Sequence, residues 1–188
     1  MSALTTLIAP FLQRVATDNI EVYNEFSLQH ELGFFLRQRY PNHKVQFERN
    51  VKHFFPTLSN WIKHEIDIAL FQPDPLAPEW AIELKYPRNG QYPEQMFSFC
   101  KDVLFAEQLK AAGFAHAGLL IFAEDPLFWR GAHDAERIYR FFRSATPLQG
   151  SIVKPTGARN QTIQLSGSYP VEWKDISNRL RCAVIEAA

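Results

Sequence analysis

The sequence has little of several features that mark whole classes of protein. Only two of its 188 residues are cysteines, Cys100 and Cys182, which is too few for a disulfide framework or a cysteine-ligated zinc site and favours a reducing compartment, the cytoplasm. Among its eight glycines none forms a glycine-rich phosphate loop or a Gly-x-Ser-x-Gly elbow, which disfavours nucleotide hydrolases and esterases. No apolar stretch approaches the ~20 residues that span a bilayer, and the first residues lack the basic segment of a secretory signal, so no membrane partner is expected.

A net charge is also absent, because 20 Lys and Arg balance 20 Asp and Glu. Nucleic-acid binding therefore has no global electrostatic support and would depend on local clusters. One cluster lies between Arg130 and Arg159, with six basic residues against two acidic ones, and a weaker one lies at residues 44–63. Each cluster alone is equally compatible with a solvated helix face.

What the sequence does have is apolar and aromatic material for a folded core. Hydrophobic residues make up 46% and aromatic residues 14%, which excludes a disordered tail or a collagen-like chain. The length suits one domain, and no repeat or Gly/Ser linker divides the chain. We therefore expect residues 1–188 to form a single domain.

Hydrophobic spacing and turn residues predict the order of the elements. Helices are predicted over residues 2–16, 24–40 and 94–112, the last ending at Gly113. Strands are predicted over residues 44–51, 64–71, 80–86 and 115–123, with a turn or loop at the proline-rich residues 72–79. A mixed, β-rich tail is predicted to hold a helical segment at 134–143 and strands near 151–153 and 161–165. This order predicts an α/β fold in which helices flank a mixed central β-sheet, with a core at about 24–124 and a C-terminal extension at 125–188.

Acidic side chains stand inside two of the apolar strands, where a buried charge is costly unless it is compensated. Strand alternation puts Asp67 on the face opposite its isoleucine neighbours, and it puts Glu83 and Lys85 on one face of the other strand. If the two strands pair through the proline-rich turn, these three side chains converge. Two carboxylates at close range repel unless a cation lies between them, and oxygen ligands without matching Cys or His favour Mg²⁺ or Mn²⁺.

A further carboxylate, Glu31, lies within the apolar stripe of the predicted helix at 24–40. A carboxylate that faces a core must be paired, hydrogen-bonded or near a metal, so Glu31 is a candidate for the same site. The residues that form the stripe are Leu28, Leu32, Phe35 and Leu36.

The strand aspartate followed by Glu-x-Lys on the next strand resembles the PD-(D/E)XK, or restriction-endonuclease-like, nuclease superfamily. The element order over residues 24–124 is similar to the αβββαβ core of that superfamily, and Tyr169–Trp173 is similar to a bacterial branch of mostly uncharacterised members. By position, Asp67 and Glu83 match the two acids of the motif and Lys85 its lysine. Glu31 matches the helix glutamate. The sequence departs from the motif at Ile66, where the motif's name places proline, and neither Gln95 nor Gln108 fits the glutamine motif of many members.

The resemblance implies a phosphodiesterase that cleaves DNA and depends on Mg²⁺ or Mn²⁺. It implies that Asp67 and Glu83, with the backbone carbonyl of Leu84, hold the metal, and that Lys85 orients or helps to deprotonate the attacking water. Glu31 would bind the water shell of the metal or a second ion. The basic candidates for contact with the DNA backbone are Arg88, Lys101, Arg137, Arg140 and Arg143. A homodimer would supply the two sites that cutting both strands requires.

Other interpretations stay open. The chain could be a catalytically silent nuclease fold that binds DNA or protein in a mobile-element or defence system, or a hydrolase of small phosphate compounds. Taken singly, Asp67 could cap a turn or pair with Lys63. Glu31 could be a boundary residue of an imperfect amphipathic helix, and Glu-x-Lys could be a charge pair on an exposed strand.

Overall fold

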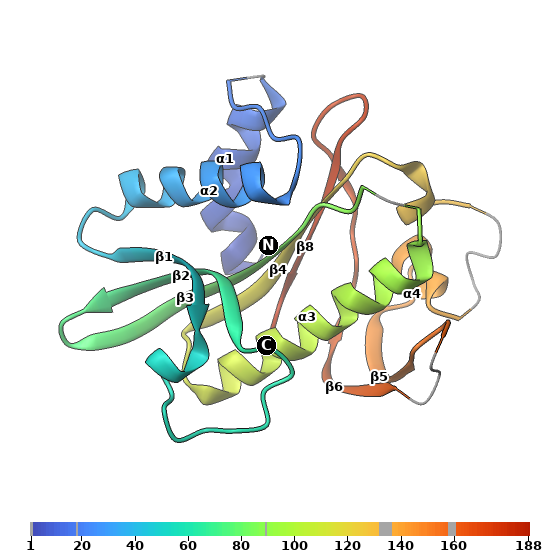
Figure 1. Ribbon diagram of the computed structural model, residues 1–188. Coiled ribbons are helices and arrows are strands. Elements are labelled where there is room, and N and C mark those ends of the chain that lie inside the picture. Colours follow the sequence, from blue (N-terminus) through green and yellow to red (C-terminus); the bar gives the residue numbers. More distant parts are fainter. Residues whose placement is uncertain (1, 18, 89, 132–136, 158–160) are drawn as a thin grey trace.

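The computed structural model describes residues 2–17, 19–88, 90–131, 137–157 and 161–188, and Figure 1 shows its elements. The helices are α1 (Ala3–Ala16), α2 (Glu25–Arg39), α3 (Tyr92–Ala112) and α4 (Tyr139–Arg143), with 3₁₀ turns η1 (Val51–His53) and η2 (Pro126–Phe128). The strands are β1 (Lys44–Asn50), β2 (Glu65–Pro73), β3 (Leu76–Lys85), β4 (His116–Ala123), β5 (Leu148–Val153), β6 (Thr162–Tyr169), β7 (Lys174–Asp175) and β8 (Arg181–Glu186). Within these ranges, no helix combines the length and the apolar character needed to cross a membrane.

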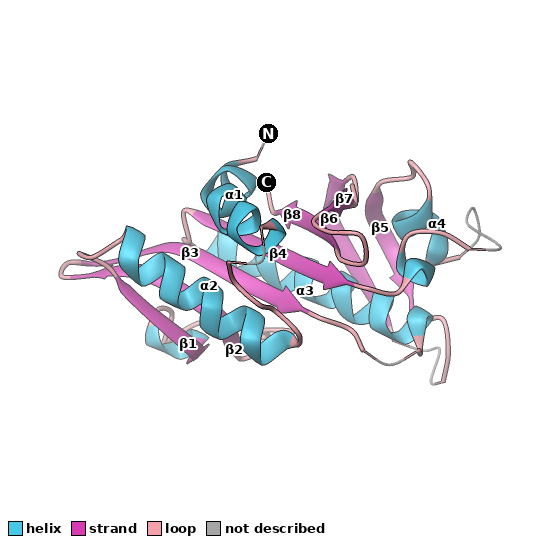
Figure 2. Ribbon diagram, turned by 90° about the horizontal axis from the view of Figure 1, so that it is seen from above, coloured by secondary structure: helices cyan, strands magenta, loops and turns pink. Residues whose placement is uncertain are grey.

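The six strands of the main sheet follow the order β1-β2-β3-β4-β8-β7. β3 and β4 run parallel, joined by α3, and the other neighbouring strands are antiparallel, so the sheet is mixed as expected. β5 and β6 form a separate two-stranded sheet. Seen from above, α1 and α2 lie on one face of the main sheet and α3 on the other (Figure 2). The predicted fold class is confirmed.

Local capping explains the starts of α1 and α2 and the end of α3, whereas α3 begins at Tyr92, two residues before the predicted start and without a side-chain cap. The Ser2 hydroxyl accepts a hydrogen bond from the backbone N–H of Thr5 at the start of α1. Asn24 and Ser27 form a reciprocal capping box at the start of α2. At the end of α3, Gly113 has φ of +131°, a conformation that costs glycine far less than other residues.

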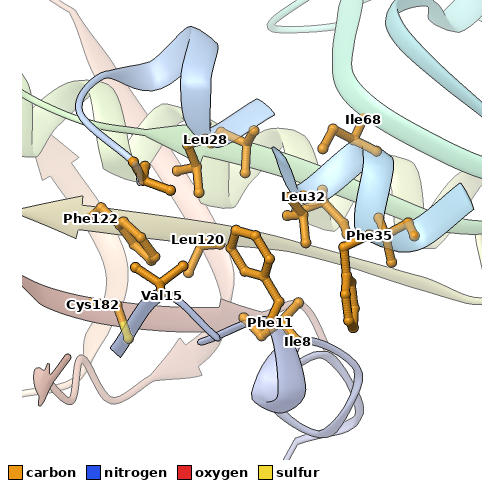
Figure 3. Packing of buried hydrophobic residues seen from close by; sticks show 14 of the residues in the cluster. Ile8, Phe11, Val15, Leu28, Leu32, Phe35, Ile68, Leu120, Phe122 and Cys182 are labelled. Carbon is orange, nitrogen blue, oxygen red and sulfur yellow. The ribbon is translucent and has the colours of Figure 1, made fainter. Parts of the chain in front are cut away.

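Both faces of the main sheet are covered by apolar side chains. On one face α1 and α2 pack onto the sheet through residues such as Phe11, Leu32 and Leu120 (Figure 3). On the other face α3 contributes Phe99 and Phe105 to two further clusters. Central strands covered on both faces read as nearly continuous apolar runs, so any ionised side chain they carry is removed from water and must be compensated within the protein.

The turn between β2 and β3 is much shorter than the loop expected at residues 72–79. β2 reaches Pro73 and β3 begins at Leu76. Pro78 lies inside β3, although proline cannot donate to a strand ladder. It is tolerated because it pairs with Phe71 next to a register shift and lies before Trp80, where the pairing of β3 with β4 begins.

The C-terminal part also differs from expectation. Of the helical segment predicted at 134–143, residues 134–136 lie outside the described residues, and only Tyr139–Arg143 is α-helical in the remainder. Both predicted tail strands are present and longer. The strand β8 was not predicted, because its apolar run Cys182–Ile185 is too short for a clear period, yet it pairs with β4 inside the main sheet. The C-terminal extension therefore completes the sheet.

Replacing Gly118 with alanine should destabilise the fold. Gly118 lies in β4 between β3 and β8, and an added Cβ would lie 2.5 Å from the Ile185 carbonyl oxygen and 2.6 Å from Leu4 Cδ2. Because β4 is hydrogen-bonded to a strand on each side, it cannot shift to relieve these contacts. We therefore expect Gly118→Ala to lower the free energy of unfolding by about 1–3 kcal/mol or more, measured by urea denaturation. Gly90→Ala is the control, since no described atom lies within 4 Å of its added Cβ. Equal stability of the two variants would contradict this packing.

Candidate active site

β2 and β3 stop pairing where their acidic residues stand. The last paired residues are Ile68 and Ile82. One step further along, the backbone N–H of Leu84 donates to Asp67 Oδ2 at 2.7 Å, and the N–H of Asp67 donates to Glu83 Oε1 at 3.3 Å. The two carboxylates thus replace the backbone carbonyls as acceptors, which opens the hairpin and holds both side chains in fixed positions.

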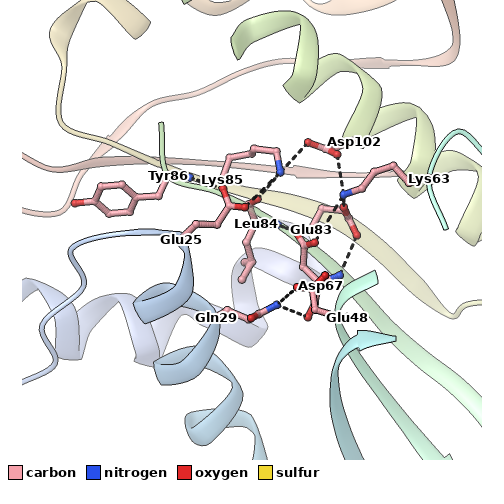
Figure 4. A network of polar contacts seen from close by, with 10 residues as sticks. All are labelled: Glu25, Gln29, Glu48, Lys63, Asp67, Glu83, Leu84, Lys85, Tyr86 and Asp102. Carbon is pink, nitrogen blue, oxygen red and sulfur yellow. Dashed lines mark hydrogen bonds and ion pairs between the residues drawn. The ribbon is translucent and has the colours of Figure 1, made fainter. Parts of the chain in front are cut away.

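A lysine outside the motif lies between these carboxylates. Lys63, from the segment that leads into β2, pairs with Glu83 Oε2, and its Nζ lies 3.7 Å from Asp67 Oδ1 (Figure 4). The same Nζ lies 3.1 Å from Oδ1 of Asp102, a residue of α3. The pair of Asp67 with Lys63, left open by the sequence, is therefore present, but as part of a larger cluster.

Lys85 connects the same cluster to α2. Its Nζ lies 3.3 Å from Asp102 Oδ2 and 3.9 Å from Glu25 Oε1, and it donates a hydrogen bond to the Leu84 carbonyl at 2.8 Å. The structure thus brings together Asp67, Glu83 and Lys85, the three residues of the motif. Two ammonium groups and three carboxylates meet between the sheet and α3.

Burial controls the protonation of this cluster. The exposed fraction is 0% for Glu83, 2% for Asp102 and 9% for Asp67. Burial raises the pKa of Glu83 well above its usual range, and the neighbouring Asp67 and Asp102 raise it further, while Lys63 opposes the rise. Burial likewise raises the pKa of Asp67 against the effect of both lysines.

The two lysines keep their charge despite burial. Burial lowers the pKa of each, but for Lys63 the carboxylates of Glu83, Asp102 and Asp67 reverse the effect. For Lys85 the reversal comes from Asp102, Glu25 and Asp67, so the pKa of both lysines is raised. The pKa values of the acids and of the lysines therefore shift in the same direction for different reasons: burial raises those of the acids, and the neighbouring carboxylates raise those of the lysines. The three central carboxylates outnumber the two ammonium groups, and one more proton or a further cation would balance their charges.

α2 contacts the cluster through Glu25 and Gln29, not through the predicted Glu31. Gln29 donates a hydrogen bond to the backbone carbonyl of Asp67 at 2.9 Å, and Glu25 accepts one from the N–H of Tyr86 at 3.2 Å. Glu31 instead lies 3.2 Å from His30 Nδ1 with its side chain 33% exposed, and it makes no hydrogen bond or ion pair to the cluster within the described residues. The apolar stripe reveals which face of α2 is buried but not which border of that face adjoins the site.

Asp102 is the carboxylate that sequence reasoning missed. It lies on the buried face of α3, among side chains such as Phe99, Val103 and Phe105. A carboxylate within an apolar helical stripe is the same signal that drew attention to Glu31, so applying it to α3 would have found Asp102.

The basic candidates for DNA contact lie in two regions. Arg88 is exposed just beyond β3, and Lys101 is half-buried on α3 beside the cluster residue Asp102. Arg137 and Arg140 line a cavity of about 360 Å³ between α4 and β5. Arg143 donates to the Leu127 carbonyl at 2.9 Å. Arg159, at the end of the basic stretch, lies outside the described residues.

The donor set suits a hard divalent cation. In the described part of the chain no three His, Cys, Asp or Glu side chains form a ready metal-binding group. Mg²⁺, however, commonly takes only one or two carboxylates and completes its shell with water and phosphate oxygens. Asp67 and Glu83 already direct one oxygen each at a single cation, the Lys63 ammonium. The carbonyl of Leu84 lies on the same strand end and is engaged by Lys85. These residues therefore fit the metal.

Comparisons with protein-family models, with curated proteins and with solved structures find no match to this chain. The resemblance to the PD-(D/E)XK nucleases thus depends on the motif residues and on the order of the elements. That order, α2-β1-β2-β3-α3-β4, is the predicted helix, three strands, helix and strand.

Replacing Glu83 with glutamine should change how stability depends on pH. Because burial raises the pKa of Glu83, the folded chain binds this proton more readily than the unfolded chain, whose pKa stays near 4.5. The contribution of Glu83 to the free energy of unfolding is thus largest below that pH. It falls as the pH rises toward the folded pKa, by about 1.4 kcal/mol for each pH unit between the two values.

Urea denaturation in the presence of a chelator, from pH 4 to pH 8, tests this expectation. The stability of the wild-type protein should fall with rising pH relative to that of Glu83→Gln, which has no proton to lose. Glu65→Gln, at an exposed position of the same hairpin, should follow the wild type. Parallel curves for wild type and Glu83→Gln would show that the pKa of Glu83 is not raised.

Proposed function

We propose that this chain is a metal-dependent phosphodiesterase that cleaves DNA. The observation that carries the proposal is the opened end of the β2–β3 hairpin, where buried Asp67 and Glu83 lie beside Lys85. Burying carboxylates costs stability unless they are compensated, and such perturbed groups concentrate at functional sites. Together with the element order, this arrangement favours a PD-(D/E)XK-type site over a chance charge pair.

Each residue has a distinct role in the proposed reaction. Asp67, Glu83 and the carbonyl of Leu84 would hold Mg²⁺ or Mn²⁺. The bound metal would lower the pKa of a water molecule and neutralise charge on the scissile phosphate. Lys85 would donate to the attacking water or to a phosphate oxygen and stabilise the charge that develops in an in-line attack. Asp102, 3.3 Å from Lys85 Nζ, would hold that ammonium group in position.

DNA as the substrate is supported by local rather than global charge. The chain has no net charge, so the affinity for DNA would come from contacts of individual basic side chains with phosphates. Arg88 lies just beyond β3, and Lys101 lies within α3, one residue before Asp102. Arg137 and Arg140 line a hollow that opens to solvent and could take a phosphate.

One observation favours a second function. The Lys63 ammonium contacts both of the proposed metal-binding carboxylates, and a nuclease fold with an ammonium group in that position could persist as a DNA- or protein-binding module without catalysis. The two functions differ in whether added metal produces cleavage.

Cleavage of supercoiled plasmid with Mg²⁺ or Mn²⁺ tests the proposal. Lys85→Ala and Asp67→Ala should each lower the rate by about 10²–10³ or more, because each removes a group that acts on the transition state. Lys174→Ala, at an exposed lysine of β7 outside the site and both basic clusters, should cleave like the wild type. Activity that persists in both site variants would reveal a contaminant. A folded, metal-loaded wild type that cleaves neither duplex, single-stranded nor branched DNA would favour the binding module.

DNA binding without cleavage, measured in Ca²⁺, tests the basic hollow. If Arg137 and Arg140 each contact one phosphate, replacing both with alanine should weaken binding. It should also reduce the slope of log K against log salt concentration by about 2, since each contact contributes ~0.9. Arg39→Ala, at an exposed position on α2, is the matched control. An unchanged slope in the double variant would exclude this hollow from the DNA contact surface.

A further inference from the structure

Lys63 is the one member of the cluster that does not come from a helix or a strand. It lies between η1 and β2, and its Nζ lies within 4 Å of carboxylates on β2, β3 and α3. Its Nζ also lies 5.6 Å from the centre of the Phe105 ring. The motif assigns no role to a lysine at this position.

We propose that Lys63 is a built-in counter-cation that occupies the cation position between Asp67 and Glu83 and that must leave before Mg²⁺ or Mn²⁺ can bind. This inference rests on the proposed function, since it presupposes that the site takes a metal. It assigns Lys63 a positioning role that sets the metal affinity of the site.

The hydrogen bonds of the two carboxylates make this competition direct. Asp67 Oδ2 accepts from the backbone N–H of Leu84, and Glu83 Oε1 accepts from the backbone N–H of Asp67. The other oxygen of each carboxylate, Oδ1 of Asp67 and Oε2 of Glu83, faces the Lys63 ammonium. A metal ion therefore needs the same two oxygen atoms that Lys63 holds.

The charge balance also favours replacement of the Lys63 ammonium by a divalent cation. With Lys63 and Lys85 in place, the carboxylates of Asp67, Glu83 and Asp102 leave one negative charge uncompensated. A divalent cation in the position of the Lys63 ammonium would leave none. An ammonium group and a divalent cation about 4 Å apart in a buried site would repel strongly, so the two cannot share the position.

Of the two lysines, Lys63 is the one whose side chain can move out of the cluster. Its side chain is 29% exposed, against 14% for Lys85, and it belongs to an irregular segment rather than to the sheet. A lysine side chain is long and flexible and its ammonium group is strongly hydrated in water, so Nζ can move out to solvent once a divalent cation compensates the carboxylates in its place. Lys85 is fixed by β3 and remains to act on the phosphate.

Isothermal titration of Mn²⁺ into the metal-free protein tests the inference without reference to activity. Lys63→Met, which keeps the length of the side chain and removes its charge, should bind Mn²⁺ at least tenfold more tightly than the wild type. Lys63→Gln, a polar alternative in case the methionine variant does not fold, should also bind more tightly. Lys63→Arg should not, because it retains the charge. Lys52→Met is the control and should match the wild type.

A thermal readout accompanies the titration. In chelator, Lys63→Met should melt below the wild type, because its buried carboxylates have lost a counter-ion, and saturating Mn²⁺ should raise its melting temperature by more than that of the wild type. Adding Asp67→Asn to Lys63→Met should abolish the binding, which would locate the ion at this site.

The outcomes separate the two levels of the proposal. If the wild type binds Mn²⁺ and neither Lys63→Met nor Lys63→Gln binds more tightly, Lys63 does not compete with metal, and the inference is overturned while the proposed metal site remains. If neither the wild type nor any variant binds Mn²⁺, the metal-dependent function itself fails, and the inference fails with it.

Discussion

The constraint on which this structure depends is the burial of more carboxylate than ammonium charge between the sheet and α3. Glu83 is inaccessible to solvent and Asp102 nearly so, and Lys63 pairs with both carboxylates while Lys85 pairs with Asp102. The need to compensate these buried charges explains why β2 and β3 pair only as far as Ile68 and Ile82, the residues next to Asp67 and Glu83. The backbone N–H groups released there donate to Asp67 and Glu83, so the opened hairpin stabilises the charges that its own strands carry.

The layered fold supplies the low-dielectric surroundings that make these charges consequential. Because α1 and α2 cover one face of the main sheet and α3 the other, side chains on both faces of β3 are shielded from water. In water the same ion pairs would be weak, whereas in the interior each group strongly affects the protonation of its neighbours. The parallel pairing of β3 and β4, with α3 between them in sequence, also brings Asp102 over the strand that carries Glu83 and Lys85.

In the proposed scheme, Lys63 would decide between catalysis and binding without catalysis. As an internal counter-ion it lets the protein fold with the acidic residues in place and without a metal. If the Lys63 ammonium group leaves when metal binds, this lysine would regulate metal binding. If it stays, the site would be catalytically inert. Both outcomes use the same contacts, and they differ only in the free energy with which a divalent cation displaces an ammonium group.

The sequence by itself determined the features that depend on neighbouring residues. Helix periodicity, with Asn24 as a cap and Gly113 as an end signal, located the first three helices, because capping and amphipathic spacing act within a few residues. Strand alternation placed Asp67 on one face and Glu83 with Lys85 on another, because successive side chains of a strand alternate whatever the fold around them.

Only the tertiary structure decided which distant elements meet. It selected Glu25 and Gln29 of α2 rather than Glu31, brought Asp102 and Lys63 into the cluster, and inserted β8 beside β4. These outcomes depend on how helices pack on the sheet and on which strands pair across long separations in the chain. Such contacts are set by the burial of whole faces, which a local pattern of residues does not encode.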